Sequence, residues 1–524
     1  MRICLVALAV NVIAASTCYA QATSPNIKIA DGELAGHRSG ASEAFLGIPF
    51  AAPPVGGNRW RAPQPPARWQ GTREATVFGP SCPQPVAKAG FGPWTHEYVV
   101  QNQVNEDCLS LNVWRPANIA GKRPVLVWIH GGGFSSGSGS VPIYDGAALA
   151  SRGILVVTIN YRLGVLGFLA HPELSAQATG DAPGNFGLQD QIAALKWVKR
   201  NIAAFGGDPD AVTIAGQSAG SVSVHALVAS PMAEGLFRAA IAESGLPGLL
   251  PMRSLKDAEQ DGVAFGVARK APTLAAMRRL PIEALMTPAD GERPSPFRFG
   301  PIVDGALLPA DPVQMFADGR TKDIPMIVGQ NVDEASAMSP AYGANTSEAY
   351  ARLLDGSFGD RVGLFKSIYP SDSDEERRKS SKLILLDRGL AGMWDWSRLR
   401  DRHALSPTYG YLFSHIEPGQ EAPKYGAFHS SEIPYVFGTL AASPERGFGS
   451  VDQKISAAMM SYWINFTVTG NPNGKGLTAW PAFRSADPKV LKLDDVTAVK
   501  PLLPPVTMKA MQSFIKDGGR VSMF

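Results

Sequence analysis

Short runs of hydrophobic residues alternate along the chain with longer segments in which hydrophobic residues recur at helical spacing. Strands that are buried on both faces have such continuous runs, and these occur at 125–129, 154–159, 212–215, 324–328 and 409–413. Residues 190–205 have the helical spacing, and the two glycines that follow them are typical of a helix end. This alternation predicts an α/β fold with a mostly parallel sheet covered by helices on both faces.

Two stretches, 256–296 and 335–405, are more polar and lack strand-like runs. We interpret both as helical insertions in a single sheet domain that extends over residues 23–524. A charge-rich run at 371–379 lies inside the second stretch, and it is typical of the solvated start of a helix rather than of a binding site.

The first 22 residues have the pattern of a signal peptide. Arg2 precedes a hydrophobic run at 3–15, and small residues lead to a cleavage point after Ala20 or Ala22. The run is too short for a membrane anchor, and the residues before Cys18 match a lipid-attachment signal poorly. We therefore expect an exported protein, periplasmic or secreted, with no transmembrane anchor after the signal is removed.

Removal of the signal would leave two cysteines, Cys82 and Cys108, in the mature chain. Two cysteines in an exported protein most simply pair, so we expect a disulfide between them. The alternative is a pair of free buried thiols, which an oxidising compartment disfavours.

Composition and charge mainly exclude classes of protein and of binding partner. The chain has 524 residues, of which 45% are hydrophobic and 18% are charged, and this excludes a disordered protein, a coiled coil and a collagen-like fibre. Its 49 basic and 46 acidic residues give a formal charge of +3. That balance gives no reason to expect nucleic acid or an anionic membrane surface as a partner.

The sequence GQSAG at 216–220 directly follows the hydrophobic run at 212–215 and precedes a helix-like segment that extends to residue 228. This strand–turn–helix context is the one that a G-x-S-x-G nucleophile requires. The two glycines leave room for the crowded backbone at Ser218. The N–H group of Ala219, at the start of the helix, can face a developing oxyanion.

A second glycine motif, HGGGF at 130–134, follows the run at 125–129. Glycines without side chains let backbone N–H groups converge on a substrate oxygen, as in the other half of an oxyanion hole. A flexible turn and a phosphate-binding loop are the alternatives, but the G-x-x-x-x-G-K-[ST] pattern of a phosphate loop is absent here.

A nucleophilic serine needs a histidine as base and a carboxylate that orients this histidine. We favour His429, because it lies in a loop that precedes a hydrophobic run. His415 ends a predicted strand and could compete, and His403 is a further candidate. His225 lies in the helix after the serine, where packing explains it better.

Asp333 and Glu334 follow the run at 324–328, and local reasoning leaves both open as the orienting acid. Asp304 is a weaker candidate, and any of the three could be a surface or turn carboxylate. The sequence has no His and Cys cluster with the spacing of metal ligands, so we expect neither a metal nor an organic cofactor.

Taken together and in order, these motifs resemble the type-B carboxylesterases, the family that includes the cholinesterases. The matching segments extend from residue 47 to residue 473, and they are GIPFAAPPVG, EDCLSLNV, HGGGF, NYR, GNFGLQDQ, FGGDPDAVTIAGQSAG, GQNVDE, FHSSEIPYVFG and TGNPN. The resemblance implies an α/β-hydrolase fold with a mostly parallel central sheet, and the hydrolysis of small-molecule esters.

The resemblance also implies roles for individual residues. They are a catalytic triad of Ser218, His429 and Glu334, an oxyanion hole from the N–H groups of Gly132, Gly133 and Ala219, a Cys82–Cys108 disulfide, and a structural ion pair between Arg59 and Glu106.

The chain departs from the family pattern at three positions. Gln217 replaces the Glu that precedes the serine in many members, and Ala335 replaces the usual Gly after the acid. Trp94 does not match the position at which cholinesterases stack choline, so cholinesterase activity is not implied.

The reaction class leaves alternatives open. The same triad could cleave amides, thioesters or lactones, and some relatives are inactive proteins with a binding or adhesion role. The presence of all three triad residues favours an enzyme. Several large side chains could line a substrate pocket, although core packing explains most of them; they are Phe134, Phe186, Met338, Tyr342 and Trp394.

Overall fold

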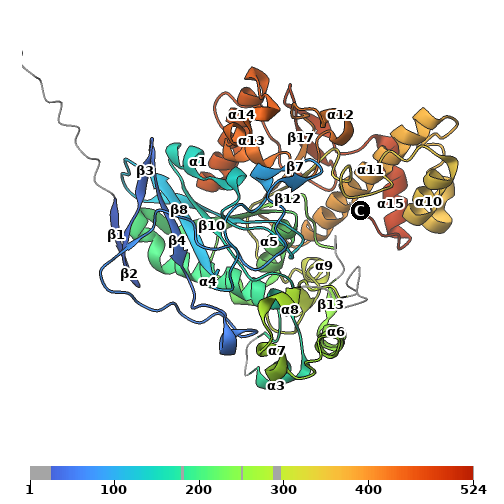
Figure 1. The fold of residues 1–524 in the computed structure, drawn as a ribbon. Helices are drawn as coiled ribbons and strands as arrows, with labels where there is room; N and C mark the ends of the chain where they lie inside the picture. The colour runs from blue at the N-terminus through green and yellow to red at the C-terminus, as the bar shows by residue number, and fades with distance from the viewer. Residues whose placement is uncertain (1–24, 179–181, 249–251, 287–296, 523–524) are drawn as a thin grey trace, which may run out of the picture.

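The computed structural model describes residues 25–178, 182–248, 252–286 and 297–522, and its centre is an 11-stranded sheet (Figure 1). The strands are ordered β18-β17-β16-β15-β12-β11-β9-β10-β8-β4-β3. Their bounds, in chain order, are β3 His37–Ser39, β4 Ser42–Pro49, β8 Ser110–Pro116, β9 Arg123–Ile129, β10 Leu155–Ile159, β11 Gly207–Gln217, β12 Ala239–Glu243, β15 Met326–Asn331, β16 Thr408–Phe413, β17 Lys489–Leu493 and β18 Ala498–Pro501.

The inner strands from β10 to β17 pair in parallel, and the strands toward both edges pair antiparallel. The predicted parallel sheet is therefore confirmed for its centre, although two of its parallel strands, β12 and β17, and the strands toward the edges are not among the predicted runs. The run at 324–328 gives a strand that begins only at Met326, after Pro325. A proline has no N–H group for the hydrogen bonds of a central strand, which explains this shift.

Alternate residues of β9 show how the sheet is covered. Val125, Val127 and Ile129 pack in one core with α4 (Phe186–Asn201) and α5 (Ala219–Ala229). Leu126 and Trp128 pack in a second core with α13 (Ile433–Phe437) and α14 (Ser450–Thr469). Successive side chains of a strand point to opposite faces, so the continuous hydrophobic run reflects burial on both sides.

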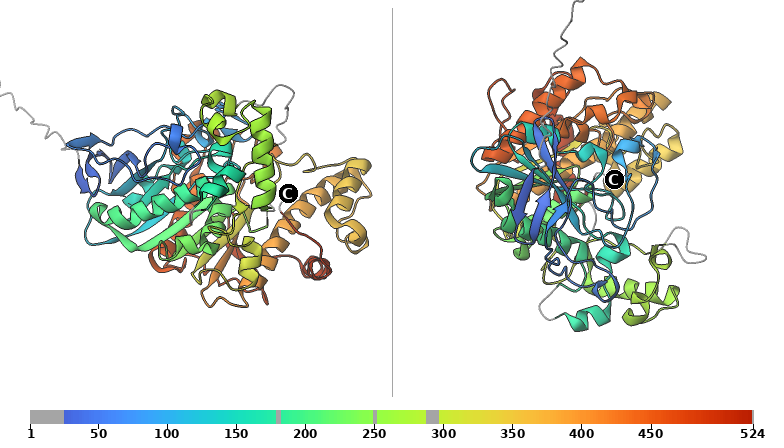
Figure 2. Two further views of the ribbon diagram at one scale, coloured as in Figure 1. Left: turned by 90° about the horizontal axis from the view of Figure 1, so that it is seen from below. Right: turned by 60° about the vertical axis from the view of Figure 1, so that its left-hand side comes forward.

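Both polar stretches contain helices, and the two groups of helices lie at different sides of the sheet (Figures 1 and 2). The first group is α6 (Leu255–Ala268), α7 (Leu274–Arg278) and α8 (Ile282–Met286); the second is α10 (Ser347–Phe358) and α11 (Asp374–Arg400), against which α15 (Pro505–Lys516) packs. The charge-rich run is the start of α11, where Ser373 and Glu376 form a capping box. Residues 287–296 of the first stretch lie outside the described residues.

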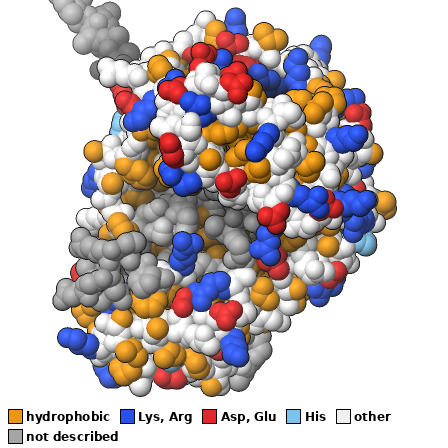
Figure 3. All heavy atoms as spheres, turned by 90° about the vertical axis from the view of Figure 1, so that its right-hand side faces the viewer, with side chains coloured by type: hydrophobic (Ala, Val, Ile, Leu, Met, Phe, Trp, Pro, Cys, Tyr) orange, Lys and Arg blue, Asp and Glu red, His pale blue; other side chains and the backbone are white. Residues whose placement is uncertain are grey.

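The remaining elements are short and complete the shell around the sheet. The strands are β1 Asn26–Ile29, β2 Gly32–Ala35, β5 Thr72–Glu74, β6 Gly90–Phe91, β7 Trp94–Thr95, β13 Arg253–Ser254 and β14 Ile302–Val303, and the helices are α1 Ala147–Ser151, α2 Gly164–Phe168, α3 Pro172–Gln177, α9 Pro312–Ala317 and α12 Ala422–Tyr425. Basic and acidic side chains are interspersed over the face drawn in Figure 3. In the part of the chain that the structure describes, every helix is too short or too polar to cross a membrane. The predicted signal peptide lies outside the described residues.

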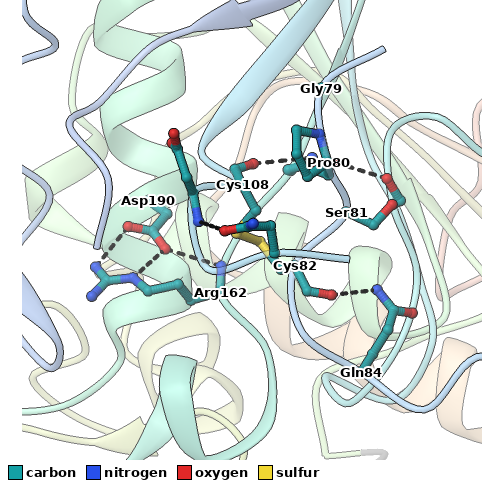
Figure 4. The surroundings of a disulfide bond; sticks show 12 residues. Gly79, Pro80, Ser81, Cys82, Gln84, Cys108, Arg162 and Asp190 are labelled. Atoms are coloured by element: carbon teal, nitrogen blue, oxygen red, sulfur yellow. Dashed lines mark hydrogen bonds and ion pairs between the residues drawn. A yellow bond between two sulfur atoms is a disulfide. The ribbon is translucent and has the colours of Figure 1, made fainter. Parts of the chain in front are cut away.

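Cys82 and Cys108 form the expected disulfide (Figure 4). The Asn160 side chain donates to the Cys108 carbonyl oxygen at 3.0 Å. The Gln84 side chain donates to the carbonyl oxygens of Cys82 at 2.9 Å and Gly137 at 2.8 Å. The disulfide therefore braces the segment that follows the glycine motif at 130–134.

One buried and one partly buried ion pair hold the loops at this end of the sheet. Arg162 donates to Asp190 through Nε and Nη2, each at 2.7 Å, and it joins the end of β10 to α4 (Figure 4). Arg59 donates to both carboxylate oxygens of Glu106 at 2.6 Å, so the ion pair implied by the family resemblance is confirmed. In both pairs the arginine is bidentate, and this geometry fixes the direction of the loop that carries it.

Replacement of both Cys82 and Cys108 by alanine is expected to lower the free energy of unfolding by about 3.5 kcal/mol. The cross-link closes a loop with a sequence separation of 26, and its loss gives the unfolded chain more conformational freedom. Denaturant unfolding of the two proteins measures the difference. Thiol titration of the denatured, unreduced protein is the control, and two reactive thiols in the mature protein would contradict the disulfide.

Candidate active site

Ser218 occupies the turn between β11 and α5, as the strand–turn–helix context predicted. Its φ of 58° and ψ of −122° are strained for a residue with a side chain. Such strain persists where the surrounding structure enforces it, and it is frequent at active sites. The Ser218 hydroxyl lines a cavity at the carboxyl end of the sheet, beside the first turn of α5.

The two flanking glycines are required by close backbone contacts. A Cβ atom on Gly220 would lie 2.0 Å from the carbonyl oxygen of Ile129, and one on Gly216 would lie 2.7 Å from the backbone of Gly220. Any side chain at either position would push α5 away from β9 and widen the turn. The glycines therefore set the close approach of strand and helix that holds Ser218 in place.

The glycine motif after β9 forms one rim of the same cavity, to which Gly132 and Gly133 contribute. The Tyr161 hydroxyl donates to the His130 carbonyl oxygen at 2.8 Å and so holds the start of this loop. Ala219 is the first residue of α5, and the first N–H groups of a helix have no partner within the helix. The glycine rim thus lines the cavity together with Ser218, and the start of α5 directly follows this serine.

His429 lies in the loop between α12 and α13, and it lines the cavity together with Ser218. Its Nδ1 donates to Glu334 Oε2 in a short hydrogen bond between buried groups. The other Glu334 oxygen accepts from the backbone N–H of Asn331 at 2.7 Å. This arrangement orients the imidazole and leaves its Nε2 on the cavity side.

Asp333 and Asp304, the other candidate acids, have different partners. Asp333 accepts from the Ala427 N–H at 2.9 Å and from the Tyr342 hydroxyl, so it fastens the loop after β15 to the loop that carries His429. Asp304 accepts from the Asn185 side chain at 2.7 Å. Both carboxylates thus serve to hold loops.

The other three candidate histidines lie in other surroundings. His225 is buried in α5 against Phe316 and Trp396, and burial lowers its pKa to about 3. His415 is held by Asp452 and Asp495, with one hydrogen bond to each ring nitrogen. His403 is exposed, and its Nε2 lies 2.9 Å from the Ala317 carbonyl oxygen. Of these four histidines, His429 is the one that lines the cavity with Ser218.

The cavity has a volume of about 470 Å³, and most of its wall is apolar or aromatic. Its larger side chains are Val86, Phe91, Trp94, Tyr98, Val99, Val100, Val141, Tyr144 and Met338. Of the five side chains that the sequence offered as pocket residues, Met338 is therefore the one that lines this cavity. Phe134, Phe186 and Trp394 are buried in the core, and Tyr342 bonds Asp333.

Sequence reasoning missed two direct contacts to His429. The Gln217 side-chain amide lies 3.1 Å from His429 Nε2, so an uncharged group borders the nitrogen that faces the cavity. The Trp94 indole donates to the His429 carbonyl oxygen at 2.9 Å. The sequence marks both residues only as departures from the family pattern, and no local signal connects either of them to a histidine hundreds of residues away.

Buried carboxyl groups near His429 change the pKa of its imidazole. Burial lowers the pKa of His429, but the charges of Glu334 and Glu432 and the hydrogen bond that His429 donates to Glu334 outweigh this and raise the pKa above 6.5. Burial, together with the charge of Glu334, raises the pKa of Glu432 to about 7. Asn331 donates to Glu432 at 2.6 Å, and so it contacts both carboxyl groups.

The comparisons with known proteins agree with this geometry. A family model described as the carboxylesterase family matches residues 23–508. The chain is 39% identical over 461 residues to the fumonisin B1 esterase of Sphingopyxis macrogoltabida, and the aligned region covers 85% of this chain and 82% of that protein. It is 34% identical over 480 residues to the para-nitrobenzyl esterase of Bacillus subtilis (strain 168), covering 90% and 94% of the two chains.

The same likeness holds in three dimensions. A solved PNB esterase superimposes with a TM-score of 0.79 at 32% sequence identity, covering 93% of this chain and 99% of that one. Its sheet, like the sheet described here, is that of an α/β hydrolase. The chain therefore belongs to the carboxylesterase family, a family of serine ester hydrolases, and it has their α/β-hydrolase fold.

Proposed function

We propose that this protein hydrolyses carboxylic esters through an acyl-enzyme on Ser218, with His429 as general base and Glu334 as the acid that orients it. The observation that carries the proposal is the hydrogen bond from His429 Nδ1 to Glu334, made by a histidine that shares one cavity with Ser218. A nucleophile, a base and an orienting acid in this relation are the recurring requirement of serine hydrolases.

In the first half of the reaction, Ser218 attacks the acyl carbon while His429 Nε2 takes its proton. The N–H groups of Gly132, Gly133 and Ala219 stabilise the oxyanion, and the loss of one such donor raises the barrier by about 3 kcal/mol in comparable enzymes. His429 then gives the proton to the leaving alcohol. In the second half, water replaces the alcohol, and the same proton transfers release the carboxylic acid and free Ser218.

The cavity wall favours neutral esters with an apolar or aromatic part. Among the described residues that line it, none is Asp, Glu, Lys or Arg. Gln217 presents an uncharged amide beside His429, so the site lacks the carboxylate that would attract a cationic alcohol. We therefore expect aliphatic and aromatic esters to be cleaved faster than choline esters.

The proposal is tested by a fluorophosphonate probe together with the hydrolysis of para-nitrophenyl acetate. We expect stoichiometric labelling of Ser218, located by peptide mass spectrometry, and loss of hydrolysis in proportion to labelling. A protein that neither reacts with the probe nor cleaves the ester would be an inactive binding relative. Parallel assays with an amide, a thioester and a lactone of the same acyl group distinguish the other reaction classes.

The rate of ester hydrolysis is expected to fall at acidic pH with an apparent pKa above 6.5 in kcat/KM. Protonated His429 cannot accept the proton of Ser218, and the carboxylates of Glu334 and Glu432 stabilise that protonated form, so activity is lost as pH falls through this raised value. A pH profile with two esters of different leaving groups measures it. In Glu334→Gln the acidic limb should move to lower pH; an unchanged limb would contradict the assignment.

Export is part of the proposal, with cleavage after Ala20 or Ala22. It is supported by the disulfide, because disulfides persist mainly in oxidising compartments. N-terminal sequencing of the protein recovered outside the cytoplasm would locate the cleavage point.

A further inference from the structure

Three side chains of metal-ligand type converge beside the wall of the cavity. His96 and Glu97 belong to the short helix His96–Tyr98, and Glu445 belongs to the short helix Pro444–Arg446. His96 Nδ1 lies 3.4 Å from Glu97 Oε2 and 3.4 Å from Glu445 Oε1. The three atoms all lie within 4.8 Å of one another, so one ion could contact them together.

These separations match a tetrahedral metal site better than they match hydrogen bonds. A charge-assisted bond between an imidazolium and a carboxylate has a length of about 2.7–2.9 Å. Ligands at about 2.0–2.1 Å from a tetrahedral Zn²⁺ ion are separated from each other by about 3.3–3.4 Å. Both 3.4 Å distances from His96 Nδ1 correspond to edges of such a tetrahedron.

Glu97 supplies a second, independent observation. Its side chain is 1% exposed, and Oε2 makes no hydrogen bond of ordinary geometry to the described residues; its neighbours are His96 Nδ1 at 3.4 Å and the Ser443 hydroxyl. The other oxygen, Oε1, accepts from Arg446 Nε at 2.8 Å and from the Thr95 hydroxyl at 2.7 Å. A buried carboxylate oxygen without a well-formed hydrogen bond is costly, and a bound cation would satisfy it, while the neighbours of Oε1 fix the direction of the carboxylate.

The local charge is suited to a cation. Arg446 is the one guanidinium of the cluster, and it is shared between Glu97 and Glu417. The two ligand carboxylates, Glu97 and Glu445, outnumber it, whereas burial raises the pKa of Glu417 to about 8. The Ser443 hydroxyl donates to Glu445 Oε1 at 3.1 Å and holds that ligand toward the cluster.

We propose that His96, Glu97 and Glu445 bind a divalent transition-metal ion, with Zn²⁺ as the best match. An imidazole with two carboxylates suits Zn²⁺, whereas Ca²⁺ and Mg²⁺ prefer sites made of oxygen ligands alone. Glu445 also lines a separate surface cavity of about 300 Å³, which leaves room for a water molecule as the fourth ligand. The site is structural and distinct from the Ser218 cavity.

The ion would brace one wall of the catalytic cavity. Trp94 and Tyr98 flank the two ligands His96 and Glu97 in the sequence, and both line that cavity. Trp94 also holds the His429 carbonyl oxygen. A bound ion would fasten this segment to the helix that carries Glu445 and so hold the wall in one position.

The test is calorimetric titration of Zn²⁺ into untagged mature protein, without the predicted signal peptide and its two cysteines, that has been freed of metal with a chelator. We expect one ion per chain and a visible absorption spectrum of tetrahedral type when Co²⁺ replaces Zn²⁺. His96→Gln and Glu445→Gln, at half-exposed side chains, should each weaken Zn²⁺ binding at least tenfold. Circular dichroism checks that both variants remain folded.

The matched control is Asp495→Asn, which alters a second cluster around His415. Both ring nitrogens of His415 are already hydrogen-bonded, to Asp452 and Asp495, so this cluster should bind no ion and the variant should keep full Zn²⁺ affinity. Absence of binding at millimolar Zn²⁺, retention of affinity in His96→Gln, or loss of affinity in Asp495→Asn would overturn the proposal. These readouts are independent of ester hydrolysis.

Discussion

Ser218→Ala is expected to lower kcat for ester hydrolysis by a factor of about 10⁵ or more, down to the rate that oxyanion stabilisation and binding alone sustain. The side chain stands at the end of β11 with a positive φ of 58°, and it lines the cavity with His429. Alanine removes the nucleophilic oxygen without adding bulk at this crowded turn. The folded protein should therefore be intact and nearly inactive.

The measurement is the hydrolysis of para-nitrophenyl acetate, corrected for the spontaneous reaction, with fluorophosphonate labelling as a second readout. Ser136→Ala is the matched control, because Ser136 lines the same cavity but follows the glycine motif instead of β11. The control should retain its rate within about tenfold and still be labelled. Hydrolysis by Ser218→Ala at a substantial fraction of the normal rate would remove the proposed nucleophile.

Glu334→Gln is expected to lower kcat/KM by a factor of about 10³–10⁴. The carboxylate accepts from His429 Nδ1 and thereby keeps the proton on that nitrogen. A glutamine amide can donate to Nδ1 instead, which favours the tautomer with the proton on Nε2. In that tautomer the nitrogen that faces Ser218 cannot act as a base, although the geometry of the site is preserved.

Asp333→Asn is the variant to compare with Glu334→Gln, because the two carboxylates are adjacent in the sequence. Asp333 accepts from the Ala427 N–H and the Tyr342 hydroxyl, so its replacement should lower the melting temperature and reduce kcat/KM less than tenfold. Steady-state kinetics and thermal unfolding of both variants give the comparison. The opposite order of kinetic effects would move the role of the acid to Asp333.

Much of the fold was predictable because its determinants are local. A strand buried on both faces needs a continuous hydrophobic run, and the runs at 125–129 and 154–159 became β9 and β10 almost without change. The turn at Ser218 was predictable for the same reason, since its two glycines lie within two residues of it. The antiparallel strands β3, β8 and β18 were harder to predict, because polar residues interrupt their hydrophobic runs even where, as in β8, those residues are largely buried.

The partners of His429 were decided by the tertiary structure alone. Glu334 and Asp333 have the same local sequence context, and the resemblance to a family, not the local pattern, distinguished them. In the fold, Asp333 pairs with the backbone beside Ala427, and this register turns the next side chain, Glu334, toward His429.

The sequence by itself thus determined five strands of the sheet, the nucleophile turn, the two cysteines and, through its ordered motifs, the family. Only the tertiary structure placed Gln217 and Trp94 against His429 and brought Glu445 to His96. The physical reason is the distance along the chain over which each effect acts. Hydrophobic periodicity and backbone strain act over a few residues, whereas these contacts join segments that only the completed packing of the sheet and its loops brings together.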